Sequence, residues 1–203
     1  MVPDVIIAAN GAISRVQKFY GKCRIIGVVS HSILIGESEV ILSTLNVLKL
    51  CKVNDLIIVN YQNKFKDCID RLKMEITNPQ INYLTRGEKS KLILSEVKFK
   101  ILIKYIFSTR TFPQILKVLL QLIVRNHCEP LRLSTGAICI LLALAECLPE
   151  ELFVIGIGLD AYSSHHYDKN NIYGFGHLES DSFYFSHLKK KATKIHFTDS
   201  GLR

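Results

Sequence analysis

Three short apolar segments near the start of the chain constrain its fold most strongly. They lie at residues 5–9 (VIIAA), 23–30 (CRIIGVVS) and 56–60 (LIIVN), and they are rich in Ile and Val. The stretches between them, around 12–20 and 40–50, are expected to form helices. Strands that are apolar on both faces are typical of a parallel sheet covered by helices. The segments therefore predict an α/β fold that begins with βα units.

The rest of the chain is expected to continue this alternation. Residues 89–124 are apolar at helical intervals, and Phe112-Pro113 is expected to break them into two helices. Ser134 can cap a further helix of small and apolar residues. A central strand, a closing helix and a last strand are expected at 152–157, 178–191 and 194–197. We predict a single Rossmann-like domain over residues 1–203, with a mostly parallel sheet covered by helices.

Residues 158–177 differ from the segments around them. They are rich in Gly, Tyr, Ser, His and Asn and have little apolar periodicity, so we predict a mobile lid loop. Phenols and imidazoles in a loop that follows a strand can serve as acid–base groups of an α/β enzyme, although a solvated surface loop is the alternative. The polar side chains in question are those of Asp160, Tyr162, His165, His166, Tyr167 and His177.

Two segments could bind an anion. Asn10-Gly11 follows the first strand, where the amides of the next helix attract phosphate in parallel α/β proteins. Arg132-Leu133-Ser134-Thr135-Gly136 combines a guanidinium, two hydroxyls and helix-terminal amides, which suit a carboxylate or a phosphate. A plain tight turn and a plain N-cap beside a solvated arginine are the respective alternatives.

Composition argues against several protein classes. The six cysteines are scattered without a CxxC pair, which is expected of a reduced cytoplasmic protein with core thiols. No signal segment, charge-free apolar stretch of membrane-spanning length, P-loop or dinucleotide fingerprint is found. No neighbouring carboxylate or cysteine completes a set of metal ligands with His165, His166 or His177 at the usual spacing, so no metal site is predicted.

The net charge of +8 is concentrated in one segment. Residues 86–125 contain nine Lys or Arg residues and two Glu residues, a local balance of seven positive charges. This segment would suit an anionic membrane surface or a lipid-linked acceptor, although a solvated basic face is the alternative. Its aromatic side chains have helical spacing, which favours a packed helix over a nucleic-acid interface.

Several motifs, taken in order, resemble the bacterial sialyltransferases of glycosyltransferase family 42, which build lipooligosaccharide ends. The opening strand with Asn10-Gly11 is similar to the family's first strand and Asn-Gly. Arg132-x-Ser134-Thr135-Gly136 is similar to its Arg-x-[Ser/Thr]-[Ser/Thr]-Gly motif. The remaining matches are Gly156-Ile157 with Asp160 and two loop tyrosines, Gly176-His177 with Asp181, and the last strand. The second strand departs from the family, with Ser30-His31 where the family has Asn-Gln.

The resemblance implies an inverting transfer of sialic acid from CMP-sialic acid to a surface glycan, without a catalytic metal or other cofactor. His177 would be the general base, and Tyr162 and Tyr167 would hydrogen-bond the departing phosphate. The donor would lie against Asn10, Gly11, Asn60, Arg132, Ser134, Thr135, Gly136 and Asp160. The protein would work in the cytoplasm or at the inner face of the membrane, as a monomer or a homo-oligomer, without a specific nucleic-acid partner.

Two other functions stay open at this stage. A related transferase would use another anionic sugar donor such as CMP-Kdo, with the same base and phosphate contacts. A non-catalytic domain would bind a nucleotide or a nucleic acid without turning it over.

Overall fold

The computed structural model describes most of the chain, which forms two compact units, Met1–Lys89 and Ser90–Arg203. The described residues are 3–35, 39–62, 66–76, 79–109, 111–116, 120, 131, 133–155, 178–188 and 194–197.

The first unit contains a four-stranded parallel sheet in the order β1-β2-β3-β4. Its strands are β1 (Val5–Ala9), β2 (Arg24–Ser30), β3 (Asp55–Tyr61) and β4 (Gln80–Thr85). The two central strands are buried on both faces: Ile26, Val28, Ile57 and Val59 face one side, and Ile25, Val29, Leu56 and Ile58 face the other. This double burial explains why their sequences are apolar without alternation.

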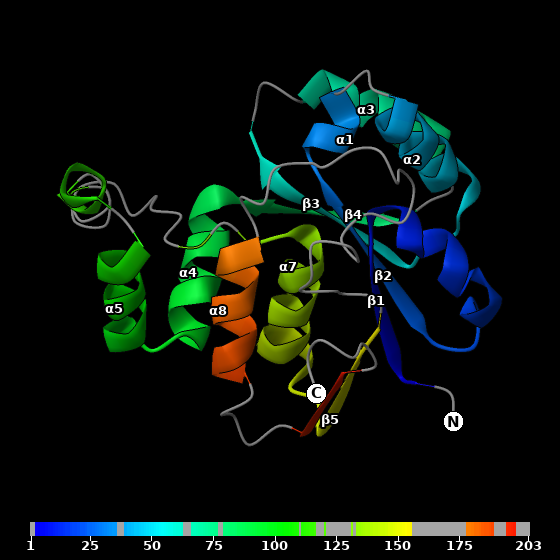
Figure 1. Cartoon of the computed structure of the whole chain (residues 1–203). Helices are drawn as coiled ribbons and strands as arrows, with labels where there is room; N and C mark the ends of the chain where they lie inside the picture. The colour runs from blue at the N-terminus through cyan, green and yellow to red at the C-terminus, as the bar shows by residue number, and fades with distance from the viewer. Residues whose placement is uncertain are drawn as a thin grey trace. The chain divides into compact units, whose positions relative to one another are not determined.

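The crossover helices of this unit cover one face of the sheet. They are the 3₁₀ helix η1 (Asn10–Phe19), α1 (Ser32–Ile35), α2 (Glu39–Leu50) and α3 (Lys66–Glu75). Figure 1 shows α1, α2 and α3 grouped on one side of the strands. The strands lie side by side in the order of the chain, and right-handed crossovers between them therefore all pass over the same face of the sheet. Ile13 of η1, Leu48 of α2 and Ile69 of α3 share one core with Ile25 and Leu56.

Gly27 allows η1 to approach the sheet closely. A Cβ atom at this position would lie 2.9 Å from Cδ1 of Ile13 and 3.2 Å from Cδ1 of Leu56. Both of these side chains are fully buried. The absent side chain of Gly27 therefore makes room for Ile13 in the core.

Hydrogen bonds and an ion pair from side chains connect the turns at the amino ends of the strands. Gln17 of η1 accepts a hydrogen bond from the Lys52 backbone N–H (2.8 Å) and donates one to the Lys52 carbonyl (2.9 Å). Asn54 Oδ1 accepts from the Ile25 N–H, and Asp55 pairs with Arg24 at 2.7 Å. These bonds hold the turn before β3 against β2 and η1.

Helix α8 (Leu178–Leu188) connects other helices of the second unit through its side chains. These helices are α4 (Arg86–Glu96), α5 (Phe99–Thr109) and α7 (Thr135–Leu142). The first residues of α4 belong to the first unit, and α7 continues as the π-helical turn η3 (Ala143–Cys147). Ser180 on α8 hydrogen-bonds Tyr105 of α5 (3.3 Å), and Nε2 of His187 bonds the Glu96 carbonyl of α4 (3.2 Å). Figure 1 shows α8, in orange, between α4 and α7.

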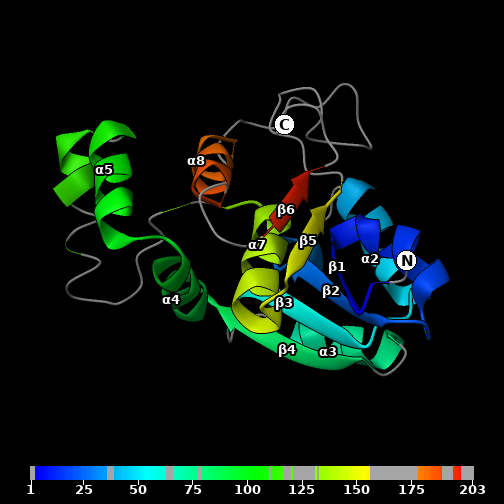
Figure 2. The same cartoon turned by 90° about the horizontal axis from the view of Figure 1, so that it is seen from below.

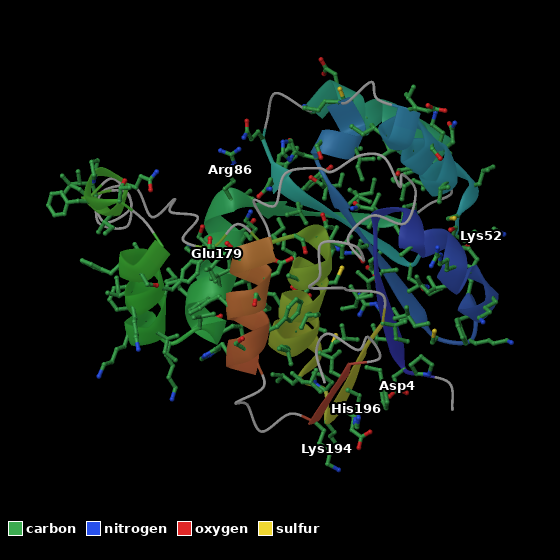
Figure 3. The ribbon with its side chains drawn as sticks, viewed as in Figure 1. Asp4, Lys52, Arg86, Glu179, Lys194 and His196 are labelled. Atoms are coloured by element: carbon green, nitrogen blue, oxygen red, sulfur yellow. The ribbon has the colours of Figure 1, made fainter. Side chains whose placement is uncertain are left out.

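A parallel two-stranded sheet completes the described part of the second unit. Its strands β5 (Glu151–Val154) and β6 (Lys194–Phe197) lie side by side in Figure 2. Glu151 pairs with both Lys194 (3.5 Å) and His196 (3.6 Å), and His196 also stacks on Phe153. Figure 3 labels Lys194 and His196, whose side chains point outward from the ribbon.

The structure confirms the α/β class with its parallel sheet and helices, and the first three predicted strands agree with β1, β2 and β3. It adds α3 and β4, which the sequence pattern did not predict. The prediction of a single break near Phe112-Pro113 was incomplete, because α4 ends and α5 begins around Lys98. The Lys98 carbonyl there accepts the first hydrogen bonds of α5, from Ile101 and Leu102.

Replacing Gly27 with Val should force Ile13 out of its position. We expect the free energy of unfolding to fall by about 1–3 kcal/mol, the usual cost of overpacking a core. Combining Gly27→Val with Ile13→Ala should cost less than the sum of the two single changes, because the smaller side chain frees the space. Urea denaturation of the four proteins in this cycle measures the coupling. Strictly additive effects would contradict the close approach of η1.

Candidate functional site: the carboxyl end of the parallel sheet

Ligands of open parallel α/β sheets bind where the strands end and the following helices begin. In the first unit this carboxyl end of the sheet lies after Ala9 of β1, Ser30 of β2 and Tyr61 of β3. Two asparagines, Asn10 and Asn60, lie there with a left-handed backbone. This end of the sheet is therefore the first candidate for a ligand site.

Asn10 joins the ends of β1 and β2. Its φ is 45°, and its Oδ1 accepts a hydrogen bond from the Ser30 backbone N–H at 3.3 Å. Asparagine tolerates left-handed backbone better than most residues with a Cβ atom. The left-handed residue of the Asn10-Gly11 turn is thus Asn10, and the side chain of Asn10 fixes the distance between the two strand ends.

The N-terminus of η1 begins at this same turn. Ala9 is its N-cap residue, and no side chain among the described residues caps it. The first amides of a helix have no partner within the helix, and they attract anions. The turn after β1 therefore offers backbone donors at the carboxyl end of the sheet.

Asn60 forms a bulge near the end of β3. Val59 pairs with Leu84 and Tyr61 with Thr85, so Asn60 is an extra residue opposite β4, and its φ is 62°. Bulges often re-aim a side chain next to a functional site. The Oδ1 atom of Asn60 is buried and has no hydrogen-bond partner among the described residues. A buried acceptor without a hydrogen bond lowers the free energy of unfolding by about 1–3 kcal/mol, and a bound partner would recover it.

Ser30 and His31 complete the group between the two asparagines. The His31 backbone N–H donates to the Val59 carbonyl (3.1 Å), which extends the contact between β2 and β3 past the last strand residue. Ser30 Oγ accepts from the Ser32 hydroxyl (2.9 Å). Asn10 follows β1 and Asn60 lies near the end of β3, and these two strands flank β2, so two strand spacings place the asparagines about 10 Å apart. The group thus presents amides, hydroxyls and an imidazole over the width of three strands.

The second predicted anion site, at the start of α7, already holds a carboxylate of the protein. Ser134 caps α7 through its hydroxyl, which accepts from the Ala137 N–H at 3.2 Å, so the predicted N-cap is confirmed. The Ser134 N–H donates to Oδ1 of Asp181 at 3.0 Å, and Asp181 is buried. Thr135 and Gly136 begin the helix and are partly exposed. Their contact with a donor stays a prediction.

Several predicted site residues lie outside the described residues. They are Arg132, Asp160, Tyr162, Tyr167 and His177, together with the predicted lid at 158–177. Of the predicted donor-binding residues, Asn10, Gly11 and Asn60 lie at the carboxyl end of the sheet in the first unit, whereas Ser134, Thr135 and Gly136 belong to the second unit.

Sequence reasoning missed two features of these sites. The Asn60 bulge has no local signal beyond an asparagine at the end of an apolar run. The bond between Ser134 and Asp181 joins residues 47 positions apart, so no short motif contains it.

The described cysteines are free, and Cys51 and Cys139 are buried as expected of core thiols, whereas Cys23 and Cys68 are partly exposed and Cys147 is exposed. Burial raises the pKa of the Cys139 thiol to about 12, which keeps it protonated and unreactive. No group of three His, Cys, Asp or Glu side chains that could hold a metal ion occurs within the described residues. None of the helices described is long and apolar enough to cross a membrane.

Comparisons with models of known protein families, with curated proteins and with solved structures each found no match.

Removing the carboxylate of Asp181 should leave the partly buried Ser134 N–H without its acceptor. We expect Asp181→Ala to lower the free energy of unfolding by about 1–3 kcal/mol, and Asp181→Asn, which keeps an Oδ1 acceptor, to cost less. The matched control is Glu179→Ala, an exposed acidic residue in the same first turn of α8 (Figure 3). Urea denaturation compares the three variants. An Asp181→Ala protein as stable as Glu179→Ala would show that the bond contributes nothing.

Proposed function

We propose that the protein is an inverting glycosyltransferase similar to the sialyltransferases of family 42, and that CMP-sialic acid binds at the carboxyl end of the β1–β3 sheet. The observation that carries this proposal is the buried Oδ1 atom of Asn60, on a bulge at this end, which has no partner among the described residues. A water molecule or a bound ligand could supply the missing donor, and we propose that the ligand does so. The amino group of a cytosine base and the hydroxyls of a ribose are donors of this kind.

The phosphate of the donor substrate fits best at the N-terminus of η1. Its N-cap residue Ala9 has no side chain that could satisfy the first amides. The start of α7 is less suitable, because the Asp181 carboxylate bonded there would repel a second anion. In this arrangement Asn10 and Gly11 lie beside the phosphate, and Asn60 contacts the nucleoside.

The chemical steps are assigned to residues by the sequence resemblance. His177 would take the proton of the acceptor hydroxyl, and Tyr162 and Tyr167 would donate hydrogen bonds to the departing phosphate. Phenols stabilise developing negative charge without adding a charge of their own, so the reaction would run without a metal. Arg132, Ser134 and Thr135 have no role in this arrangement, because the Asp181 carboxylate already accepts from the Ser134 N–H at the start of α7. We place this activity in the cytoplasm, on a precursor of a surface glycan.

Nucleotide binding is tested most cleanly by Asn60→Gly. Glycine adopts a φ of 62° readily, so the variant should fold like the parent while it loses the amide. Losing a hydrogen bond to a bound ligand costs about 1–3 kcal/mol, so the Kd for CMP should rise by roughly 5- to 150-fold. Isothermal titration calorimetry measures it. The matched control is Asn46→Ala on the exposed face of α2, which should bind CMP as the parent does.

The activity is tested by release of CMP from CMP-sialic acid in the presence of a glycan acceptor. His177→Ala should lower the transfer rate about 10²- to 10⁴-fold and leave the Kd for CMP unchanged, and His196→Ala on the exposed part of β6 serves as control. Release from CMP-Kdo alone would support the related transferase instead. Salt-sensitive nucleic-acid binding without release from either donor would support the non-catalytic domain and overturn the proposal.

A further inference from the structure

Helix α5 and the segment after it expose an unusual number of large apolar side chains. Five of the twelve exposed large hydrophobic residues among those described fall between 99 and 120: Phe99, Phe107, Phe112, Leu116 and Leu120. Phe112 is 76% exposed, Phe99 60% and Phe107 55%. Isolated exposed apolar residues are normal, but a group of them marks an interaction site. We call these five residues, with Lys98, Lys100 and Lys104, the α5 surface, in which Phe112, Leu116 and Leu120 belong to the segment after the helix.

The two sides of α5 differ sharply. Leu102, Tyr105 and Ile106 are buried, and Tyr105 contacts Ser180 and Phe183 of α8. Lys100, Lys104 and Phe107 have spacings of four and three residues, share one helix face and are exposed. Phe112, Leu116 and Leu120 follow at four-residue intervals and are exposed as well, while Ile115 between them is buried. On α5 itself, two basic groups and one phenyl ring are therefore exposed on one face, and further exposed apolar side chains follow in the next segment.

The charge of this region is entirely positive. Residues 97–125 contain six Lys or Arg residues and no Asp or Glu. A partner for this surface must be anionic and must also accept Phe and Leu side chains. A second copy docking through the same face would bring like charges together, which is unfavourable. A nucleic acid would match the charge, but Leu116 and Leu120 cannot stack on bases.

We propose that the α5 surface docks onto a bilayer containing acidic lipids, with Phe99, Phe107 and Phe112 entering the interface and the lysines contacting the headgroups. Interfacial segments of this kind combine a basic face with Phe or Leu side chains that reach the acyl boundary. Juxtaposed lysines each add attraction to an anionic leaflet. This inference concerns the second unit alone and does not depend on the nucleotide proposal.

The sequence has no tryptophan, so a single Phe107→Trp substitution provides a unique fluorescent reporter. Phosphatidylcholine vesicles that contain phosphatidylserine should shift its emission to shorter wavelength, and pure phosphatidylcholine vesicles should do so much less. Leu50→Trp is the matched control, because Leu50 is also an exposed apolar residue, on α2 of the first unit. Its emission should not change. Equal shifts for both reporters, or none for Phe107→Trp, would overturn the proposal.

Charge reversal gives a second measurement that does not use the reporter. We expect a triple change of Lys98, Lys100 and Lys104 to Glu to lower the vesicle partition coefficient, measured by co-sedimentation, by about 100-fold or more. Each lysine near an anionic surface contributes to this attraction. The matched control changes Lys22, Lys52 and Lys66 to Glu, at exposed sites of the first unit, and alters the net charge equally. This control should lower the partition coefficient much less. Circular dichroism checks that both variants fold.

Three outcomes of these experiments contradict the proposal. Equal losses of co-sedimentation for the two triple variants would show non-specific attraction. A blue shift of the Phe107→Trp emission that follows protein concentration without vesicles would identify a second copy as the partner. A blue shift on adding single-stranded DNA without vesicles would identify a nucleic acid.

Discussion

The burial of β2 and β3 on both faces is the constraint on which the first unit depends. Their Ile, Val and Leu side chains are removed from water on both sides, which stabilises the parallel register with β1 and β4. That register sets where each strand ends. It brings Asn10, Ser30 and Asn60 to the same end of the sheet, although 50 residues separate the first from the last. The candidate site thus follows from the way the core is packed.

The two ends of this sheet are organised differently. At the amino ends of the strands, Gln17, Asn54 and Asp55 all have partners, and their bonds hold turns in place. At the carboxyl end, two asparagines adopt left-handed backbone and the Oδ1 atom of Asn60 has no partner among the described residues. Strained or unsatisfied groups persist where the surrounding structure fixes them, and they occur often at binding sites. The contrast within one sheet is the physical reason for proposing a ligand site at its carboxyl end.

Apolar runs predicted β1, β2 and β3 well, because doubly buried strands have a distinctive composition. Strand β4 escaped prediction, since Gln80, Asn82 and Tyr83 interrupt its apolar residues and only Leu84 is buried. The N-cap role of Ser134 was predicted because capping is a local interaction, three residues in length. The Asp181 carboxylate on the Ser134 amide could not be predicted in this way, because it depends on how α8 packs against α7. The cap could be predicted from a short motif, whereas the contact between α7 and α8 could not.

The central claim is that a nucleotide binds at the carboxyl end of the β1–β3 sheet, and side-chain NMR tests it most directly. Titration of ¹⁵N-labelled protein with CMP should shift the side-chain amide of Asn60, identified by its absence in Asn60→Gly, along with the backbone amides of Asn10 and Gly11. The shifts should saturate together at one Kd. Saturable CMP binding that moves only the amides of Ser134 and Thr135 at the start of α7, and leaves Asn60 unchanged, would contradict the claim.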